Sequence, residues 1–146
     1  MVFMTGRYPH TIDAKGRLCI PAALRNCLGG DDLKDKFYVT LWNRGSLAAH
    51  SKESWEKLVA NFNSKSVGEQ EEMEWLITYA CPCELDGQGR ILIPTHLRDY
   101  AQLKKDVTIV GMGERAEIWD AENRAAIDAA EITPDKLGKV FKELKF

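Results

Sequence analysis

The chain has 146 residues, a formal net charge of −2 and 45% hydrophobic residues. These values are typical of a folded protein with a core, and they exclude a disordered chain, which combines low hydrophobicity with high net charge. The longest stretch without Asp, Glu, Lys or Arg is nine residues, Trp75 to Cys83, about half of what crosses a bilayer. The N-terminus resembles no signal peptide, so we expect a cytoplasmic protein with reduced cysteines and no membrane partner.

A segment of fourteen residues occurs twice, 73 positions apart. The first copy runs from Ile12 to Arg25 and the second from Leu85 to Arg98, and seven of the fourteen positions are identical. Because the offset is half the chain length, the sequence predicts a duplicated unit. We expect one domain over residues 1–146, with repeat 1 at about 5–62, repeat 2 at about 80–131 and a C-terminal helix at 134–145.

Each repeat predicts the same order of elements: strand, tight turn, strand, short helix, strand, turn, strand, helix. Pro21 and Pro94 follow apolar strands at the points where the short helices should begin. The strand at Phe37 to Trp42 corresponds to the one at Val107 to Val110, and each is followed by a Gly-containing turn. Ser51 and Asp120 are N-cap candidates for the last helix of each repeat.

Two further helices are predicted outside the repeated pattern. A polar connector at residues 63–66 precedes a helix with Met73, Leu76 and Ile77, which Pro82 should end. Near the C-terminus, Thr133 followed by Pro134 is typical of an N-cap with proline at the first helical position. The apolar residues that follow at helical spacing are Leu137, Val140, Phe141 and Leu144.

The repeated motif requires a chain reversal between an aspartate and an arginine. Gly16 and Gly89 occupy the same place in the two copies, where hairpins with a bulge need a positive φ. One interpretation of Asp13 with Arg17, and of Asp86 with Arg90, is an ion pair that clamps the turn and contributes about 0–1 kcal/mol.

The same loops also carry groups that bind nucleic acid. Lys15 and Arg17 lie at one loop, and Gln88 and Arg90 lie at the other. Arginine, lysine and glutamine side chains contact phosphates and the edges of bases, and a two-stranded ribbon fits the major groove. Spacing alone leaves both interpretations open.

The paired motif resembles the MraZ family of bacterial transcriptional regulators. It reads Asp-x-(Lys/Gln)-Gly-Arg-(Leu/Ile)-x-Ile-Pro in both copies. The segments Thr5 to Asp13, Cys83 to Pro94 and Glu117 to Trp119 are similar to segments of that family, and the similarity covers nearly the whole chain. One departure is the segment Ser46 to His50, which is less apolar than usual in the family and leaves the local strand packing open.

The resemblance implies a mainly β fold with α+β content, in which two repeats intertwine in a pseudo-twofold, swapped-hairpin, double-split β-barrel with flanking helices. It also implies a ring-shaped homo-oligomer, often an octamer. The implied function is binding to double-stranded DNA at repeated boxes upstream of the division and cell-wall gene cluster, with nucleoid association. The residues carried over to that role are Asp13, Lys15, Arg17, Asp86, Gln88 and Arg90.

The remaining chemistry-bearing residues favour no reaction. Cys81 and Cys83 are spaced too closely for a usual zinc knuckle, and Cys19 aligns with Leu92, which predicts a core position. The three histidines are scattered, with His96 expected on a helix surface, and the four tryptophans are expected in the core. We therefore predict no enzyme activity, no cofactor, no metal and no small-molecule substrate.

Two other classes of function remain as hypotheses. One is a protein-interaction module of antitoxin type, because related swapped-hairpin barrels include antitoxins. The other is a cysteine-dependent enzyme, which would need bound metal or would lose function when the cysteines are replaced.

Overall fold

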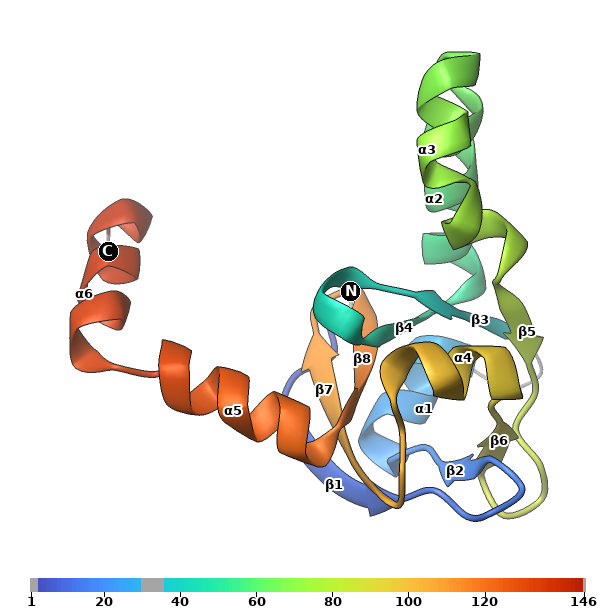
Figure 1. Ribbon diagram of the computed structural model, residues 1–146, viewed down its shortest axis with the longest axis horizontal. Coiled ribbons are helices and arrows are strands. Elements are labelled where there is room, and N and C mark those ends of the chain that lie inside the picture. Colours follow the sequence, from blue (N-terminus) through green and yellow to red (C-terminus); the bar gives the residue numbers. More distant parts are fainter. Residues whose placement is uncertain (1–2, 30–35, 146) are drawn as a thin grey trace.

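The two repeats fold into the same succession of elements in the computed structural model, which describes residues 3–29 and 36–145 (Figure 1). Repeat 1 contains β1 (Arg7–Thr11), β2 (Arg17–Cys19), α1 (Ala22–Gly29), β3 (Phe37–Leu41), a 3-10 turn (Asn43–Gly45), β4 (Leu47–His50) and α2 (Lys52–Asn63). Repeat 2 contains β5 (Cys81–Cys83), β6 (Arg90–Leu92), α4 (Thr95–Ala101), β7 (Asp106–Met112), β8 (Arg115–Asp120) and α5 (Ala121–Glu131). The helix α3 (Val67–Thr78) joins the repeats, and α6 (Pro134–Leu144) follows the second. The fold is α+β.

Strand pairing exchanges elements between the repeats. Six antiparallel strands form one sheet in the order β1-β7-β8-β4-β3-β5, and β2 pairs with β6 in a separate two-stranded ribbon. Replacing each strand by its equivalent in the other repeat gives the order β5-β3-β4-β8-β7-β1. This is the same sheet counted from its opposite edge. The repeats are therefore related by an approximate twofold that passes between β4 and β8.

The expected hairpin between the first two strands of each repeat is wrong. β1 pairs with β7 from Arg7 opposite Val110 to Thr11 opposite Asp106, whereas β2 pairs with β6. A single bridge between Ile12 and Leu18 is all that joins β1 to β2 in the described part of the chain. The first strand of each repeat reaches a longer partner strand in the other repeat, so only the turn itself remains of the hairpin.

The six-stranded sheet is not closed into a barrel. Its two edges are β1 and β5, and no pairing between them occurs within residues 3–29 and 36–145. The core lies between this sheet and the β2–β6 ribbon. It is built from equivalent residues of the two repeats: Leu18 and Ile91, Ile20 and Ile93, Leu24 and Leu97.

The predicted helix ends are confirmed for the most part. Ser51, Asp120 and Thr133 each accept a hydrogen bond from a backbone N–H three residues later, as N-caps do. The connector at residues 63–66 ends in Ser66, which caps α3. Pro82 does not end α3, because the helix stops at Thr78; the proline lies in β5, an edge strand where its missing N–H is tolerated.

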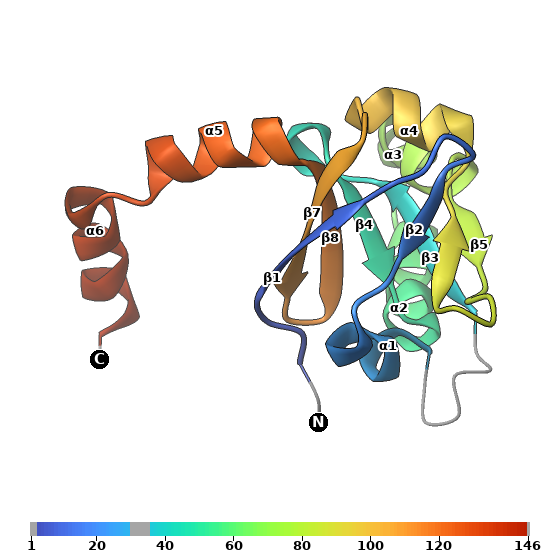
Figure 2. The same cartoon turned by 90° about the horizontal axis from the view of Figure 1, so that it is seen from below.

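Several predictions of burial are wrong. Helical spacing predicts an apolar face of Ala126, Ile127 and Ala130 on α5. The buried residue of this helix is instead Arg124, while Ala126 and Ala130 are exposed, because only the first turn of α5 lies against the sheet (Figure 2). Trp75 is exposed on α3, which has no buried residue. Cys19 is only half-buried, since position 92, which it matches in the repeat, faces outward.

The segment with the unusual sequence packs well. All four residues of β4 are buried, and Ser46 before it is buried as well. β4 lies beside β8 at the middle of the sheet, where Ala48 and Ala49 are both buried. No helix in the described ranges combines the length and apolarity that crossing a membrane requires.

Candidate nucleic-acid interface

The motif Asp13–Arg17, called loop 1 below, is a tight turn held by its own aspartate. The carbonyl of Asp13 accepts a hydrogen bond from the N–H of Gly16 at 3.0 Å, and Gly16 has a φ of 90°. The Oδ1 atom of Asp13 accepts from the backbone N–H groups of Lys15 and Arg17 at 3.0 and 2.9 Å. Its Oδ2 atom accepts from Nε of Arg17 at 2.6 Å. Asp13 thus accepts the hydrogen bonds of the backbone N–H groups in the turn and also orients the side chain of Arg17.

The motif Asp86–Arg90, called loop 2, repeats this geometry. Oδ1 of Asp86 accepts from the N–H groups of Gln88 and Arg90 at 2.8 and 2.9 Å, and Oδ2 accepts from Nε of Arg90 at 2.9 Å. The N–H of Gly89 donates to the carbonyl of Asp86 at 3.0 Å, and the φ of Gly89 is 75°. The ion-pair interpretation of both motifs is confirmed, and it extends to the backbone.

The charged form of both aspartates is favoured in the folded chain. The pKa of Asp13 lies below its ordinary value of 3.8, and the largest cause is the hydrogen bond from the N–H of Arg17. The N–H of Arg90 lowers the pKa of Asp86 in the same way. Both carboxyl groups are exposed, and at neutral pH each remains ionised beside its arginine.

Each loop rests on an arginine from the other repeat. A Cβ atom placed on Gly16 would lie 2.7 Å from the carbonyl oxygen of Ile93 and 2.8 Å from Nε of Arg98. A Cβ atom on Gly89 would lie 2.3 Å from Nη2 of Arg25. The backbone also crosses over, since the N–H of Ile93 donates to the carbonyl of Gly16 at 2.8 Å. Only glycine allows this close approach between the repeats.

Arg25 and Arg98 are functional candidates that the sequence prediction did not select. Nε of Arg25 donates to the carbonyl of Ile20 at 2.8 Å, and Nε of Arg98 donates to the carbonyl of Ile93 at 3.0 Å. Both side chains are partly buried beneath the loops. Their identity in the two repeats was visible in the sequence, but the loop that each one supports belongs to the other repeat, which spacing along the chain does not indicate.

The six predicted residues form two groups, one at each end of the β2–β6 ribbon. Arg17 lies opposite Leu92 in this ribbon, and Arg90 lies opposite Cys19. Since a turn precedes each strand and the strands are antiparallel, the two turns lie at opposite ends (Figure 2). Lys15 and Gln88 are both exposed at the tips. Within the described ranges, the side chain of each loop arginine donates to the protein only through Nε, which leaves its two terminal nitrogens for a ligand.

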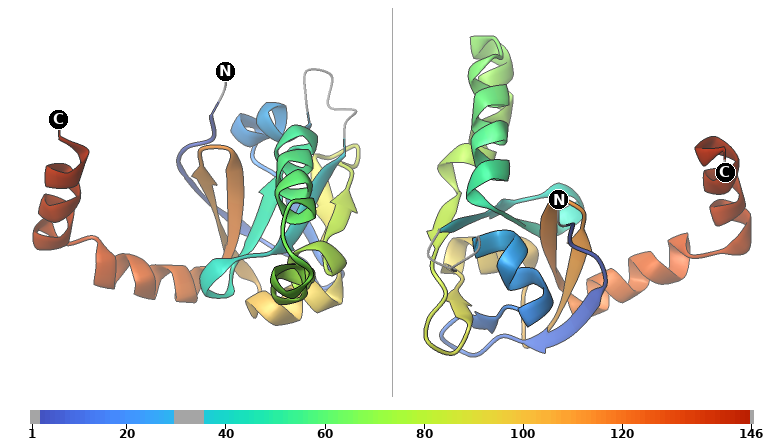
Figure 3. Two further views of the ribbon diagram at one scale, coloured as in Figure 1. Left: turned by 90° about the horizontal axis from the view of Figure 1, so that it is seen from above. Right: turned by 180° about the vertical axis from the view of Figure 1, so that it is seen from behind.

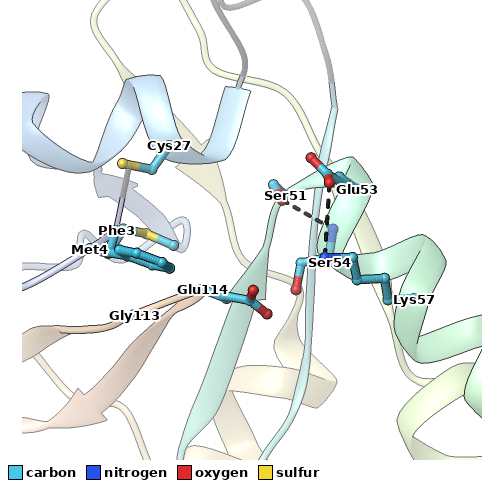
Figure 4. A pocket seen from close by; sticks show the side chains of 9 residues that line it. All are labelled: Phe3, Met4, Cys27, Ser51, Glu53, Ser54, Lys57, Gly113 and Glu114. Atoms are coloured by element: carbon cyan, nitrogen blue, oxygen red, sulfur yellow. Dashed lines mark hydrogen bonds and ion pairs between the residues drawn. The ribbon is translucent and has the colours of Figure 1, made fainter. Parts of the chain in front are cut away.

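A separate hollow of about 240 Å³ lies between the N-terminal segment and the start of α2 (Figure 4). Phe3, Met4 and Cys27 border one side, and Ser51 and Lys57 border the other. No residue of either loop lines it.

The cysteines and histidines of the described residues form no metal site. Burial raises the pKa of Cys83, which keeps this thiol protonated. His96 lies exposed on α4, as predicted. Among the described residues, no three His, Cys, Asp or Glu side chains gather as a metal site would require.

In a comparison with known protein families, one family matches both halves of the chain. The family described as "MraZ protein, putative antitoxin-like" matches residues 3–78 and again residues 76–132. The chain belongs to the MraZ family. The two matches fall on the two repeats and confirm the resemblance that the paired motif indicated.

Curated members of the MraZ family align with most of the chain. A protein named transcriptional regulator MraZ from Leuconostoc mesenteroides is 42% identical over 127 residues, 85% of each chain. Its namesake from Oenococcus oeni is 38% identical and covers 95% of this chain and 94% of its own. Another from Heliobacterium modesticaldum is 39% identical over 90% of this chain and 94% of its own.

Proposed function

We propose that this MraZ-family chain is a sequence-specific transcriptional regulator and that loops 1 and 2 bind double-stranded DNA. One observation carries the proposal: the same hydrogen-bonded turn occurs twice, and each copy exposes the terminal nitrogens of an arginine next to a polar tip residue. The name of the curated relatives, transcriptional regulator, supports it.

The side chains of the two loops have different proposed roles. Arg17 and Arg90 donate to base edges or phosphates through their terminal nitrogens, Lys15 neutralises a phosphate, and Gln88 hydrogen-bonds to DNA without adding charge. Asp13 and Asp86 repel phosphate, so their proposed role is to hold the arginines in place. The net charge of −2 does not exclude binding, because a local pair of cations such as Lys15 and Arg17 can attract phosphate.

The finer features of the proposal extend the MraZ resemblance. The targets are repeated boxes upstream of the division and cell-wall gene cluster, and the protein acts in the cytoplasm, associated with the nucleoid, without catalysis or a small-molecule substrate. The two repeats form one intertwined domain of the swapped-hairpin class. The crossed pairing of β1 with β7 and of β3 with β5 supports this description, although the sheet is open.

Self-association completes the proposed mechanism. The two loops of one chain offer few DNA-contacting groups, which is too little for tight specific binding at physiological salt. A ring of several chains, such as an octamer, presents many such loops, and each box after the first binds at an effective concentration set by the assembly. The affinity should therefore rise steeply from one box to two or three.

The test is a fluorescence anisotropy titration with DNA from upstream of the gene that encodes this chain. Scrambled DNA of equal length at the same salt concentration measures non-specific binding. Variant Arg17→Ala with Arg90→Ala should lose the preference for the natural DNA, while Lys57→Ala, an exposed cation on α2, should keep it. Equal binding of the double variant and the unchanged protein would refute the assignment of the loops.

A second candidate is a protein-interaction module of antitoxin type. The family description "putative antitoxin-like" is the observation that favours it. In that case the chain would bind a protein partner, and the titration above would show the same weak affinity for natural and scrambled DNA.

A further inference from the structure

The helix α6 holds its apolar side away from the body of its own chain. Leu137, Val140 and Leu144 lie on one side of this helix at spacings of three and four residues, and Leu144 is 57% exposed. None of the residues of α6 is buried. An amphipathic helix of this kind ordinarily buries its apolar side, so the exposed side indicates a partner.

Polar contacts hold α5 against the body, and one hydrogen bond links α6 to the end of α5. Asp128 of α5 binds Arg7 of β1 and also accepts from Nε of Arg124 at 3.1 Å. The guanidinium of Arg124 packs over the ring of Trp119 at 4.9 Å from its centroid. Nζ of Lys136 donates to the carbonyl of Ala130 at 2.8 Å, which ties α6 to the end of α5. In this arrangement α6 extends from one side of the body (Figures 1 and 2), where its own sheet cannot cover it.

A second exposed apolar surface lies on α3. The hairpin of α2 and α3 leaves the body on another side, well apart from α6 (Figure 3). Val67 and Trp75 of α3 are 71% and 53% exposed, and Tyr79 follows at the end of the helix. The rings of Trp75 and Tyr79 meet edge to face at 5.8 Å, and Tyr79 meets His96 at 5.2 Å. The aromatic side chains are therefore ordered before a partner arrives, which lowers the entropy cost of binding.

The charges of the two helices are opposite. Between Pro134 and Lys145 the chain carries four lysines against Asp135 and Glu143, a net charge of +2. The helix α3 carries four glutamates and no lysine or arginine, a net charge of −4. Two α6 helices that meet face to face bring like charges together, whereas α6 on α3 brings opposite charges together. Charge thus selects α3 as the partner of α6.

We propose that the apolar side of α6 binds the exposed side of α3 on a second copy of this chain. The contact joins two different surfaces, so every chain has one α6 and one α3 to offer, and repetition of the contact gives a closed ring or a filament. The inference rests on the proposed function in its self-associating form, and it assigns the surfaces that build the ring. Neither helix includes residues of loops 1 or 2.

The experiment compares three variants by sedimentation velocity and light scattering. Leu137→Glu with Leu144→Glu removes the apolar side of α6, Trp75→Glu interrupts that of α3, and Met112→Glu is a matched control at an exposed site outside both helices. We expect the unchanged chain and the control to form the same large assembly. Both helix variants should be monomers of 16.5 kDa with unchanged circular dichroism. Assembly of either helix variant to the size of the unchanged chain would overturn the proposal.

Mixing the two monomeric variants tests the pairing itself. The α6 variant keeps an intact α3, and the Trp75 variant keeps an intact α6. An equimolar mixture should therefore form a dimer of twice the monomer mass and nothing larger. A mixture that stays monomeric would refute the inference. Pairing of α6 with α6, or of α3 with α3, would instead give a dimer of one variant on its own, before mixing, and would refute it as well.

A DNA-binding measurement distinguishes failure of the α6–α3 interface from failure of the proposed regulatory function. The affinity of both monomeric variants for DNA with one box should equal that of the control, because the loops are intact. If the unchanged chain assembles through these helices but does not distinguish natural from scrambled DNA, the interface stands and the regulatory function fails. If it binds natural DNA specifically and the helix variants still assemble, only the interface fails.

Discussion

Loop 1 and loop 2 hold the same hydrogen bonds, but loop 1 carries Lys15 at the position where loop 2 carries Gln88. In both loops an aspartate binds two backbone N–H groups and Nε of the arginine, and a glycine with positive φ lies against the other repeat. The duplicated part is thus the backbone and its support. The exposed tip differs, and the difference gives loop 1 one more positive charge than loop 2.

The support beneath the loops also differs in rigidity. Gly16 lies against a backbone carbonyl, that of Ile93, as well as against Arg98. The three atoms nearest to a Cβ placed on Gly89 all belong to the guanidinium of one side chain, that of Arg25. A carbonyl held in a core strand segment cannot move aside, whereas a guanidinium can rotate away. The two turns should therefore respond unequally to the same substitution.

The largest expected effect follows from adding one methyl group to each turn. Gly16→Ala should lower the free energy of unfolding by about 2–4 kcal/mol, because the positive φ and the contact with the carbonyl of Ile93 both oppose the side chain. Gly89→Ala should cost about 1–2 kcal/mol, mainly through its φ, since Arg25 can move. Chemical unfolding monitored by circular dichroism gives both values.

Gly87→Ala is the matched control for this comparison. Gly87 belongs to the same turn as Gly89, but no heavy atom lies within 4 Å of a Cβ placed there, and its φ is not positive. Its stability should change by less than about 0.5 kcal/mol. Equal losses for Gly16→Ala and Gly87→Ala would show that the close approach between the repeats does not constrain the loops.

The arginines come next in expected size, and they affect binding more than folding. Arg17→Ala and Arg90→Ala should each weaken specific DNA binding by about 1–3 kcal/mol if the arginine reads a base. The melting temperature should change little, because both side chains lie at the surface of the turn. Titrations against boxes with single base changes locate the position that each arginine reads. If a variant has a lower melting temperature but binds the natural box with normal affinity, its arginine stabilises the turn and does not contact DNA.

The aspartates should make the conformation of loops 1 and 2 depend on pH. Because the pKa of Asp13 and of Asp86 is lower in the folded chain than the ordinary 3.8, the unfolded chain takes up these protons first. Their contribution to stability is complete above about pH 4 and is lost as the pH falls through the lower, folded value. Backbone amide signals of Lys15, Arg17, Gln88 and Arg90 should shift together below pH 4 in NMR spectra. An Asp13→Asn variant should remove the transition from loop 1 only.

The local parts of this site could be predicted from the sequence. The reversal at Gly16, the helix starts after Pro21 and Pro94, and the N-caps at Ser51 and Asp120 depend on residues close together in the chain. Local hydrogen bonds and steric limits determine such features. The resemblance to MraZ proteins, rather than spacing, directed attention to the loops as DNA-binding elements.

The partners across the repeats could not be predicted in the same way. The pairing of β2 with β6 and the support of Gly16 by Arg98 depend on contacts between residues 71 to 82 positions apart in the chain. Periodicity also failed for α5, where Arg124 is buried because Trp119 and Asp128 surround it. A hydrophobicity pattern places alanines inward at such a helix and has no way to represent a buried cation with an aromatic and an acidic partner.

The smallest expected effect tests the single difference at the tips of the loops. If Lys15 neutralises a phosphate, Lys15→Ala should reduce by about one the slope of the logarithm of the binding constant against the logarithm of the salt concentration. Gln88→Ala should leave that slope unchanged, since an uncharged side chain releases no counterion, although it can lower the affinity at every salt concentration. The reciprocal variant Gln88→Lys should raise the slope by about one and make loop 2 behave as loop 1 does, because the two backbones are alike. Titrations with single-box DNA at 50 to 300 mM salt (roughly the range over which phosphate contacts are weakened) give all three slopes. If Gln88→Lys left the slope unchanged while Lys15→Ala lowered it, loop 2 would not approach the phosphates, and DNA contact would belong to one repeat rather than to both.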